Sequence, residues 1–369
     1  MIRILLAIVF ISSTLLDAEE LRVLLKKNVE GVVFYSSVPL NFSDKNGKII
    51  ITKKENKVKL FVKENLIVLE GFGALSSPVS VKSLFLIYLD GKPYRGYFNV
   101  YLINSELFVV NVVDLEEYLY GVVPNEIPVS WSDEVIKAQS VVARTFALSR
   151  KSNLSDSFYD LDDSTFSQVY GGYSKENERI NSLVDRTKGE ILYYAGEPAL
   201  AYYHSTCGGK TESSENIWGK DIPYLKTVQC NWCRNSPYFE WQLEISSQRL
   251  VEILKKIGKN FDSRNISVKI IDKNSSGRVA NLEFFDNSQS IVMKANNFRN
   301  LVGTSELKSL NFIVTKRNNL FLFKGYGWGH GVGMCQWGAK NMSDQGIDYR
   351  RILQYYFRGV KLVKKGKNY

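Results

Sequence analysis

The stretch "EEYLYGVVPNEIPVSWSDEVIKAQSVVARTFALSRK", residues 116–151, decides the fold. It predicts a short helix, a loop bounded by Pro124 and Pro128, and then a long helix. Residues 138–148 of the long helix are almost wholly apolar, so we expect this helix to be buried. The predicted fold class is therefore α+β, with central buried helices between a β-rich N-terminal region and a β-rich C-terminal part that contains a glycine-rich segment.

The residues on both sides of this stretch are rich in strand patterns. Residues 21–113 alternate apolar runs with polar turns, and Asp90-Gly91 marks a hairpin. Further helices are expected near residues 174–188, 247–257 and 347–357. The predicted division is a signal peptide at 1–18, a β-rich domain at 19–110, a core at 111–235 and 321–369, and an inserted β-rich subdomain at 236–320.

The composition is that of a globular protein. Of the 369 residues, 44% are hydrophobic and 13% are aromatic, which excludes disorder and fibrous structure. The net charge of +10 favours anionic surfaces such as those of a cell envelope, and the basic run at residues 361–367 adds to it. The sequence contains no RNP, zinc-finger, helix-turn-helix or P-loop pattern, so nucleic acid is not an expected partner.

The first residues are typical of a targeting segment. A basic start, Met1-Ile2-Arg3, precedes an uncharged run at residues 4–16, and the small residue Ala18 offers a cleavage site. The run is shorter than the ~20 apolar residues of a usual membrane span. We therefore predict a secreted protein of the periplasm or cell envelope. A buried N-terminal strand and an uncleaved anchor, which would be the one membrane contact, are the alternatives.

Glu126 is the first candidate for chemistry. It lies between two prolines and among Val122, Val123, Ile127 and Trp131. Apolar surroundings disfavour the charged form of a carboxyl group and raise its pKa. A raised pKa suits a general acid near neutral pH, whereas the alternative is an ordinary loop or helix-capping glutamate.

Two cations lie on the long helix. Lys137 and Arg144 are seven residues apart and share a face, on the same helix as Gln139. Buried charges need partners. The two open interpretations are a structural salt bridge, for instance between Arg144 and a buried aspartate, and a cationic wall that faces an anionic ligand.

A cluster of metal-binding residue types follows. His204-x-x-Cys207 precedes Cys230-x-x-Cys233, and one histidine with three cysteines is a tetrahedral zinc pattern. Cysteines of exported proteins often oxidise, so the rival is a disulfide among Cys207, Cys230 and Cys233. A disulfide leaves an odd thiol, which favours zinc over it. A catalytic role for Cys207 lacks an acidic partner in register.

The stretch "GYGWGHGVGMCQWGA", residues 325–339, has glycine at every second position from Gly325 to Gly333. It does not match a P-loop, which needs Gly-Lys-Ser or Gly-Lys-Thr, and its strict spacing excludes the dinucleotide fingerprint. An extended chain would gather the glycines on one face, where another backbone can approach closely. The opposite face would carry aromatic side chains and His330, which can stack on sugar rings. A tightly packed turn is the alternative.

Three blocks of the sequence together resemble one family. They are "YLYGVVPNEIPVSW…EVIKAQSVVARTFAL", "YYHSTCGGKTES…NIWGKDIPYL" and "GWGHGVGMCQWGA…MSDQGIDYRRILQYYF". The chain resembles the SpoIID/LytB family, which comprises stage II sporulation protein D and the amidase enhancers. The resemblance spans residues 94–359, and residues 236–310 match only loosely.

This resemblance implies a lytic transglycosylase that acts on peptidoglycan, especially on strands stripped of stem peptides. The family's catalytic glutamate matches Glu126, and its functional lysine and arginine match Lys137 and Arg144. Relatives often have serine where this chain has Cys335. The resemblance also implies a structural zinc ion near the His-Ser-Thr block, carried over to His204, Cys207, Cys230 and Cys233.

A single carboxyl group is enough for this chemistry. A hydrolase needs a second carboxylate as nucleophile or to activate water. In a lytic transglycosylase the sugar's own C6 hydroxyl group attacks, and its tethering lowers the entropic cost. Arg144 or Lys137 would then read the lactyl carboxylate of stripped muramic acid. The groove candidates are Lys137, Gln139, Arg144, His204, Ser205, His330 and Gln336, with the glycine-rich stretch as a wall opposite Glu126.

Two other functions compete with this one. The first is a binding protein without activity that recruits or enhances a cell-wall amidase on peptidoglycan. The second is a zinc-dependent hydrolase, which is disfavoured because four protein ligands leave no open position for water.

Overall fold

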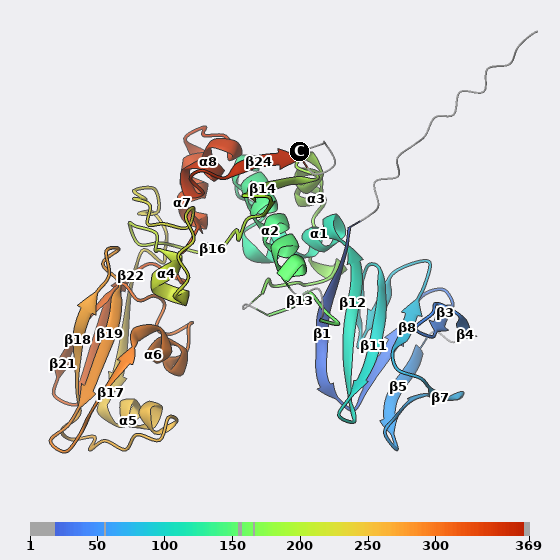
Figure 1. The fold of residues 1–369 in the computed structure, drawn as a ribbon, viewed down its shortest axis with the longest axis horizontal. Helices are drawn as coiled ribbons and strands as arrows, with labels where there is room; N and C mark the ends of the chain where they lie inside the picture. Colours follow the sequence, from blue (N-terminus) through green and yellow to red (C-terminus); the bar gives the residue numbers. More distant parts are fainter. Residues whose placement is uncertain (1–18, 55–56, 154–156, 165–166, 365–369) are drawn as a thin grey trace, which may run out of the picture.

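The computed structural model describes residues 19–54, 57–153, 157–164 and 167–364 (Figure 1). The predicted signal peptide, residues 1–18, lies outside the described residues. Strands dominate the N-terminal part and the part around residues 240–326, and helices gather between them. This arrangement confirms the α+β fold class.

Two sheets face each other in the N-terminal part. Across the seven-stranded sheet the strand order is β13-β1-β12-β11-β8-β3-β4, and across the six-stranded sheet it is β10-β9-β2-β5-β6-β7. The rings of Phe34 and Phe98, one from each sheet, lie 5.3 Å apart in the core. At the predicted hairpin Asp90 and Gly91 have φ values of 48° and 83°, as a tight turn of this kind requires. The strands of this part are β1 (Glu20–Val29), β2 (Gly31–Tyr35), β3 (Leu40–Ser43), β4 (Ile49–Lys53), β5 (Lys57–Lys63), β6 (Leu66–Leu69), β7 (Gly73–Leu75), β8 (Val79–Lys82), β9 (Ile87–Leu89), β10 (Lys92–Tyr94), β11 (Tyr97–Ile103), β12 (Glu106–Asp114) and β13 (Leu161–Asp162).

The last strand of this part leads directly into the helical core. The Asp114 side chain accepts hydrogen bonds from the backbone N–H groups of Glu116 and Glu117 and so caps α1 (Leu115–Glu126). Pro124 lies inside α1, so the predicted loop begins only after Glu126. The following helix, α2 (Asp133–Asn153), is buried from residue 138 to residue 149, as its apolar sequence predicted.

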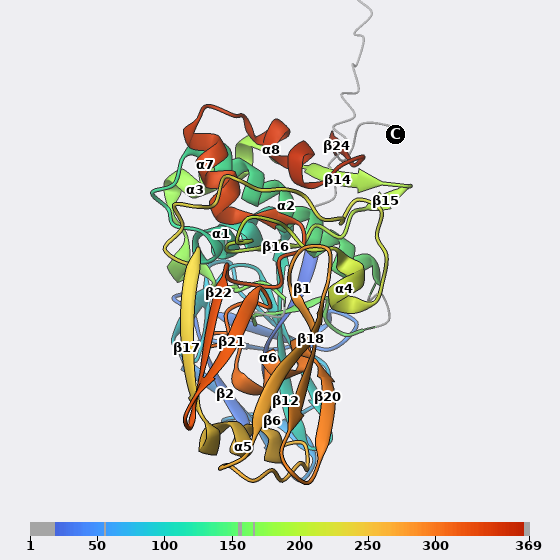
Figure 2. The same cartoon turned by 90° about the vertical axis from the view of Figure 1, so that its left-hand side faces the viewer.

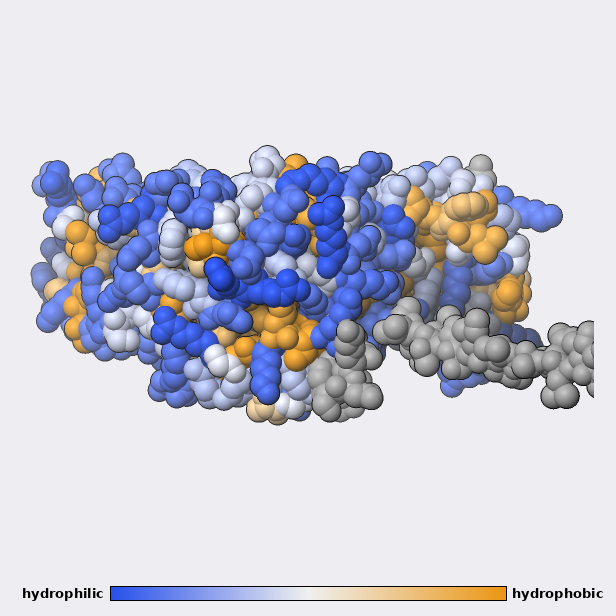
Figure 3. Space-filling model, turned by 90° about the horizontal axis from the view of Figure 1, so that it is seen from above, coloured by the Kyte–Doolittle hydropathy of each residue, from blue (hydrophilic) through white to orange (hydrophobic). Residues whose placement is uncertain are grey.

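Shorter elements surround α2 (Figure 1). The predicted helices near 174–188 and 347–357 are present as α3 and α8, whereas α7 was not predicted. The elements of this core are the 3₁₀ turn Tyr173–Lys175, α3 (Glu178–Arg186), β14 (Glu190–Tyr194), β15 (Glu197–Pro198), β16 (Tyr203–His204), α4 (Ser214–Trp218), β23 (Met334–Cys335), α7 (Gln336–Asp344), α8 (Tyr349–Tyr356) and β24 (Lys361–Lys364). The face that α7, α8, β14 and β24 form is largely hydrophilic (Figure 3).

The inserted unit has a hydrophobic cluster of its own, from Trp241 to Phe323. Two three-stranded sheets stand side by side in it, with orders β17-β22-β21 and β18-β19-β20 (Figure 2). Because β22 pairs with both β17 and β21, the unit extends to Tyr326 by its packing. Its elements are β17 (Glu240–Ser246), α5 (Ser247–Lys255), β18 (Ser267–Lys273), β19 (Val279–Phe285), β20 (Ser290–Lys294), α6 (Ala295–Val302), β21 (Phe312–Arg317) and β22 (Leu320–Tyr326).

The glycine-rich stretch is only partly a strand. After β22 the glycines at positions 327, 329, 331 and 333 all have positive φ, between 76° and 115°, so the period-two pattern does not continue as regular β-structure. The expected close approach of another backbone is confirmed. A Cβ atom on Gly333 would lie 2.0 Å from the carbonyl oxygen of Tyr202, and one on Gly327 would lie 2.5 Å from that of Thr206. These close contacts pack the glycine-rich stretch against the segment that contains β16.

Candidate functional site

Glu126 is the last residue of α1, where the helix meets the loop that leads to α2. Its side chain is partly exposed, and its Oε1 accepts a hydrogen bond from the backbone N–H of Val169 at 3.1 Å. Desolvation raises the pKa of the Glu126 carboxyl group, whereas hydrogen bonds from Val169 and from the Tyr203 hydroxyl group lower it. The net effect is a raised pKa, which confirms the expectation from its apolar surroundings.

A series of hydrogen bonds between side chains orients the hydroxyl group of Tyr203 near Glu126. The Tyr118 hydroxyl group donates to Gln168 Oε1 at 3.2 Å, which fixes the orientation of the amide. Gln168 Nε2 donates to Tyr203 Oη at 3.2 Å. Since Tyr203 Oη accepts this bond, its own hydrogen is available to Glu126. The carboxylate therefore has two donors that favour its charged form and a desolvated site that favours its neutral form, which suits a group that both gives and takes a proton.

Tyr203, Gln168 and Val169 were not among the residues expected from the sequence. The only available signal was that Tyr203 directly precedes His204 in the "YYHST" block. Gln168 and Val169 come from the polar segment after α2, which carries no recognisable motif.

One of the expected groove residues contacts Glu126 directly, and a second contacts the first. Gln336, the first residue of α7, donates through Nε2 to the backbone carbonyl of Glu126 and to Gln139 Oε1, both at 3.3 Å. Gln139 is fully buried, and among the described residues its Nε2 has no hydrogen-bond partner. Ser205 is partly exposed, and its hydroxyl group lies 3.3 Å from Thr206 Oγ1.

The loop after Glu126 is held from two sides. Arg179 on α3 donates to the backbone carbonyls of Val129 and Trp131, and it pairs with Asp133 at 2.6 Å. On the other side the ring of Trp131 lies 5.2 Å from that of Trp337 on α7. These contacts fix the direction in which the end of α1 presents its carboxyl group.

His330 supports Tyr203 rather than Glu126 itself. Its Nδ1 accepts a hydrogen bond from the N–H of Val332 at 3.1 Å, so its Nε2 carries the hydrogen and donates to the Tyr203 carbonyl at 3.0 Å. Burial, together with the charges of Arg299 and Arg278, lowers the pKa of His330 to about 4. The imidazole is therefore neutral near pH 7, and both of its nitrogens are already engaged.

Arg144 forms the structural salt bridge that the sequence left open, with a glutamate in place of the suggested aspartate. Its guanidinium group is 0% exposed and pairs with Glu116 at 2.9 and 2.7 Å. It also donates to the backbone carbonyls of Val184 and Glu190 and to Thr187 Oγ1. With its donors used and no exposed surface, the side chain ties α2 to α1, α3 and β14.

We expect Arg144→Met to lower the free energy of unfolding by about 3–5 kcal/mol, because it leaves the carboxylate of Glu116 buried without a cationic partner. The double variant Arg144→Met/Glu116→Leu should recover much of this loss. Urea unfolding of both variants and of Glu116→Leu gives the coupling. An unchanged unfolding midpoint together with lost ligand binding would instead support a ligand role.

Lys137 is engaged with its own helix and with α8. Its Nζ pairs with Glu134 at 2.6 Å and lies 5.7 Å from the ring centroid of Tyr349. Glu134 in turn accepts a hydrogen bond from the Tyr349 backbone N–H at 2.9 Å. The contact of Lys137 with a ligand remains a prediction.

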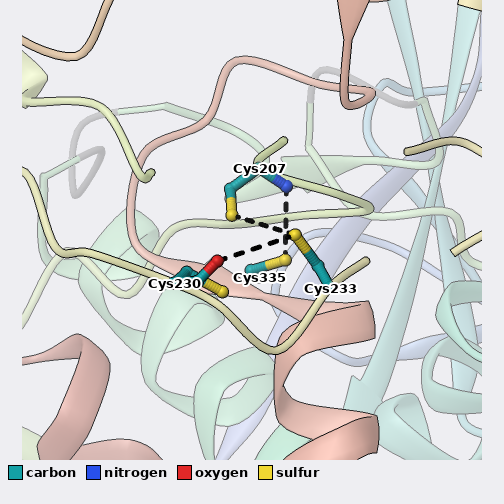
Figure 4. Close-up of side chains that lie close together, drawn as sticks. All are labelled: Cys207, Cys230, Cys233 and Cys335. Atoms are coloured by element: carbon teal, nitrogen blue, oxygen red, sulfur yellow. Dashed lines mark hydrogen bonds between the residues drawn. The ribbon is translucent and has the colours of Figure 1, made fainter. Parts of the chain in front are cut away.

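Four buried cysteines converge on one point, where their Sγ atoms all lie within 4.8 Å of one another (Figure 4). They are Cys207, Cys230, Cys233 and Cys335, and all four are free thiols. The disulfide is therefore not formed, and the cluster is compatible with a metal site. Cys335 Sγ also accepts hydrogen bonds from the backbone N–H groups of Cys207 and Gly338, at 3.2 and 3.3 Å.

The expected ligand His204 is not part of this group, and Cys335 takes its place. The Nδ1 of His204 hydrogen-bonds the Val332 carbonyl at 3.1 Å, and burial lowers its pKa well below the usual value. The sequence assignment grouped residues that are close along the chain, whereas β23 runs parallel to β16 and brings Cys335 beside them. The signal was available, since the chain has only four cysteines and all four belong to the cluster.

The inserted unit is attached to the core near this cluster. Arg278, at the β18–β19 turn, is 1% exposed and donates to the carbonyls of Cys207 and Lys210 at 2.7 and 3.0 Å. The buried carboxylate of Glu212 accepts hydrogen bonds from Asn274 and Ser276 of the same turn. A buried polar contact of this kind fixes the turn against the core.

Comparisons with known proteins match both the helical core and the inserted unit. A family model described as "Stage II sporulation protein" (SpoIID) matches residues 103–194, the segment that contains Glu126. A stage II sporulation protein D of Bacillus amyloliquefaciens is 31% identical over 274 residues, which cover 69% of this chain and 75% of that protein. The chain belongs to the SpoIID family. A second model, "Domain of unknown function (DUF8618)", matches residues 224–333, most of which form the inserted unit.

Two further proteins with other names are similar to this chain. An uncharacterized protein of Brachyspira hyodysenteriae is 36% identical to this SpoIID-family chain over 284 residues, covering 74% of this chain and 73% of that protein. An amidase enhancer of Bacillus subtilis is 33% identical over 323 residues and 75% of this chain. The match covers only 45% of the enhancer, so this chain spans less than half of its length. Among the described residues, no helix is both long and apolar enough to cross a membrane.

Proposed function

We propose that the protein is a lytic transglycosylase that cleaves peptidoglycan glycan strands, with Glu126 as its general acid and base. The carboxyl group protonates the glycosidic oxygen between N-acetylmuramic acid and N-acetylglucosamine. The resulting carboxylate then takes the proton of the C6 hydroxyl group, which attacks C1 and closes a 1,6-anhydro ring. No water enters the products, because the nucleophile belongs to the sugar.

The observation that carries this proposal is the setting of Glu126. Its pKa is raised by desolvation, and the Val169 N–H and the Tyr203 hydroxyl group donate hydrogen bonds to it. Hydrolytic glycosidases place a second carboxyl group opposite the first. A single carboxyl group with a raised pKa and two fixed donors is suited to intramolecular attack instead.

The test is to incubate the purified protein with glycan strands stripped of stem peptides and to analyse the products by mass spectrometry. We expect ends that carry the 1,6-anhydro group. Reducing ends would indicate a hydrolase, and unchanged strands would remove the enzymatic proposal.

Removing the Tyr203 hydroxyl group should change the pH dependence. This hydroxyl group lowers the pKa of Glu126, so Tyr203→Phe raises that pKa further. Because the acid must be protonated to act, the alkaline limb of the kcat/KM profile should move to higher pH. The rate at its optimum should fall about tenfold, the value of one hydrogen bond to a charged group. Tyr120→Phe is the matched control, since Tyr120 lies on the same helix as Glu126 but its hydroxyl group donates to Asp185, outside this chain of hydrogen bonds, and should leave the alkaline limb in place. Equal shifts in both variants would contradict the role of Tyr203.

A second candidate function is a binding protein without activity that enhances a cell-wall amidase. Its support is the 33% identity to the amidase enhancer of Bacillus subtilis. In that case stripped strands would bind without being cleaved, and addition of the protein to an amidase would increase release of stem peptides. We expect the peptidoglycan contact in both cases.

We further infer that the four cysteines hold a structural zinc ion. Four thiolates at about 2.3 Å from zinc lie about 3.8 Å apart in a tetrahedron, which fits sulfurs that all lie within 4.8 Å of one another. The N–H groups that point at Cys335 Sγ suit a thiolate. An ion bound by four protein ligands has no open position, so its part is to hold together the segments that carry Tyr203 and Gln336.

The cell envelope is the compartment that this function requires. The N-terminal sequence of residues 1–18 and the net charge of +10 support export and contact with an anionic wall. Fractionation of cells that express the full chain tests this, and a cytoplasmic protein would contradict it.

A further inference from the structure

An open hollow of about 600 Å³ lies on the inserted unit. Its lining residues include strand ends of the inserted unit. These ends lie on the side of the unit that is nearest the core (Figure 2). Glu240 is the first residue of β17, Tyr326 is the last residue of β22, and the two are paired in register. Lys273, the last residue of β18, closes the hollow from the neighbouring sheet.

Three of the residues that line the hollow are aligned across neighbouring strands. Lys324 on β22 is in register with Gln242 on β17 and with Ile313 on β21. Among the described residues, the side chains of Glu240, Lys273 and Lys324 form no ion pair. Two ammonium groups, one carboxylate and one amide are therefore gathered here and free to bind a ligand.

An exposed aromatic ring stands beside these groups. Tyr326 is 44% exposed, and it is one of the residues that line the hollow. A tyrosine ring offers an apolar face together with a polar tip, which suits a ligand that has both apolar and polar faces. Sugar rings have this character, since their C–H groups stack on aromatic rings and their hydroxyl and acetamido groups form hydrogen bonds.

We propose that this hollow binds a glycan that carries carboxylate groups. Lys273 and Lys324 attract the carboxylates, and the Gln242 amide donates to and accepts from the sugar. The one anion, Glu240, accepts from a hydroxyl or acetamido group. The choice of a glycan over other anionic polymers rests on the proposed function, because the lactyl ethers of stripped muramic acid supply such carboxylates. Uronic acid polysaccharides share the same chemistry.

The position of the hollow connects it with Glu126. From Tyr326 the chain continues through the glycine-rich stretch to His330, and four residues span at most about 14 Å. His330 donates to the carbonyl of Tyr203, whose hydroxyl group faces Glu126. Rings line this route in pairs: Tyr326 with Phe239 at 5.7 Å, Trp328 with Tyr238 at 4.5 Å, and His330 with Trp218 at 5.3 Å. A polymer bound in the hollow thus extends along the stretch that leads to the carboxyl group.

Binding is measured with the full chain in a Glu126→Gln background, so that no probe is cleaved. The probes are stripped glycan strands, hyaluronan oligosaccharides and neutral chito-oligosaccharides of equal length. Two variants alter the hollow, Tyr326→Ala and Lys273→Gln/Lys324→Gln. The control Lys255→Gln/Lys259→Gln makes the same change in charge at exposed positions on or just after α5.

We expect Tyr326→Ala to weaken strand binding about tenfold. The Lys273→Gln/Lys324→Gln variant should lose strand affinity and most of its salt dependence, and should keep its affinity for the neutral probe. The control should bind as the parent does. Hyaluronan bound as tightly as strands would extend the site to uronate-type glycans, whereas preference for strands would assign it to muramyl glycans.

Unchanged strand binding in both hollow variants, or an equal loss in the control, would overturn the proposal. This outcome is distinct from failure of the proposed function. Strands that bind in a Tyr326-dependent manner but never acquire anhydro ends would remove the enzymatic activity and leave the binding site.

Discussion

Glu126→Gln is expected to reduce the formation of 1,6-anhydro ends by about a thousandfold, within the range that loss of a general acid and base produces. Glutamine keeps the shape of the side chain and can still accept the hydrogen bond from Val169, so binding of strands should persist. Mass spectrometry of the ends gives the rate, and a binding assay gives the affinity.

Glu117→Gln is the matched control for this variant. Glu117 lies on the same helix, and desolvation also raises its pKa, but its carboxylate pairs with Arg95. We expect its activity to stay within a fewfold of the parent. Equal losses in the two variants would mean that the helix, and not the Glu126 carboxyl group, had been disturbed.

Glu126→Gln should also increase the stability of the folded protein near neutral pH. The folded-state pKa of Glu126 is raised, so its carboxyl group contributes stability below the unfolded pKa, and this contribution is lost as the pH rises through the folded pKa. Glutamine carries no charge at any pH and avoids that loss. Thermal unfolding should therefore show a higher Tm for Glu126→Gln at neutral pH, with no difference well below pH 4.

Removal of metal from the cysteine cluster is expected to cost several kcal/mol of folding free energy, because structural zinc sites contribute directly to folding. Cys335→Ser should bind substoichiometric zinc, and its Tm should fall by at least about 10 °C. Elemental analysis of the purified protein gives the stoichiometry, and thermal unfolding gives the loss.

His204→Ala is the companion variant for this prediction. His204 lies outside the group of four sulfurs, so this variant should keep one zinc per chain even if the loss of its buried ring lowers stability. Zinc retained in Cys335→Ser and lost in His204→Ala would restore the ligand set that sequence spacing suggested.

The sequence could predict the buried helix α2 and the raised pKa of Glu126 because the information for both is local. The apolar run at residues 138–148 is long enough to make a helix buried wherever it packs. Apolar neighbours raise the pKa of a carboxyl group. The partners of Glu126 could not be found in this way. Val169 and Tyr203 are brought to it by tertiary packing, and neither carries a motif.

Two outcomes had physical causes that the sequence conceals. The alternating glycines left an extended strand and a tightly packed turn open, and their positive φ values produce a close-packed irregular path that period-two reasoning cannot describe. The helix α1 was predicted to end earlier because of Pro124, yet a proline in the last turn costs only one hydrogen bond there. In each case tertiary contacts decided the conformation.

The cysteine cluster also has a topological consequence. Cys233 precedes the inserted unit and Cys335 follows it, so about a hundred residues leave the core and return to the same point. The entropy of closing such a loop grows only with the logarithm of its length, at about 0.6 kcal/mol for each doubling. A module of different size could therefore be exchanged between these two cysteines at little thermodynamic cost, which makes the inserted unit the natural place for relatives that share this core to diverge in what they recognise.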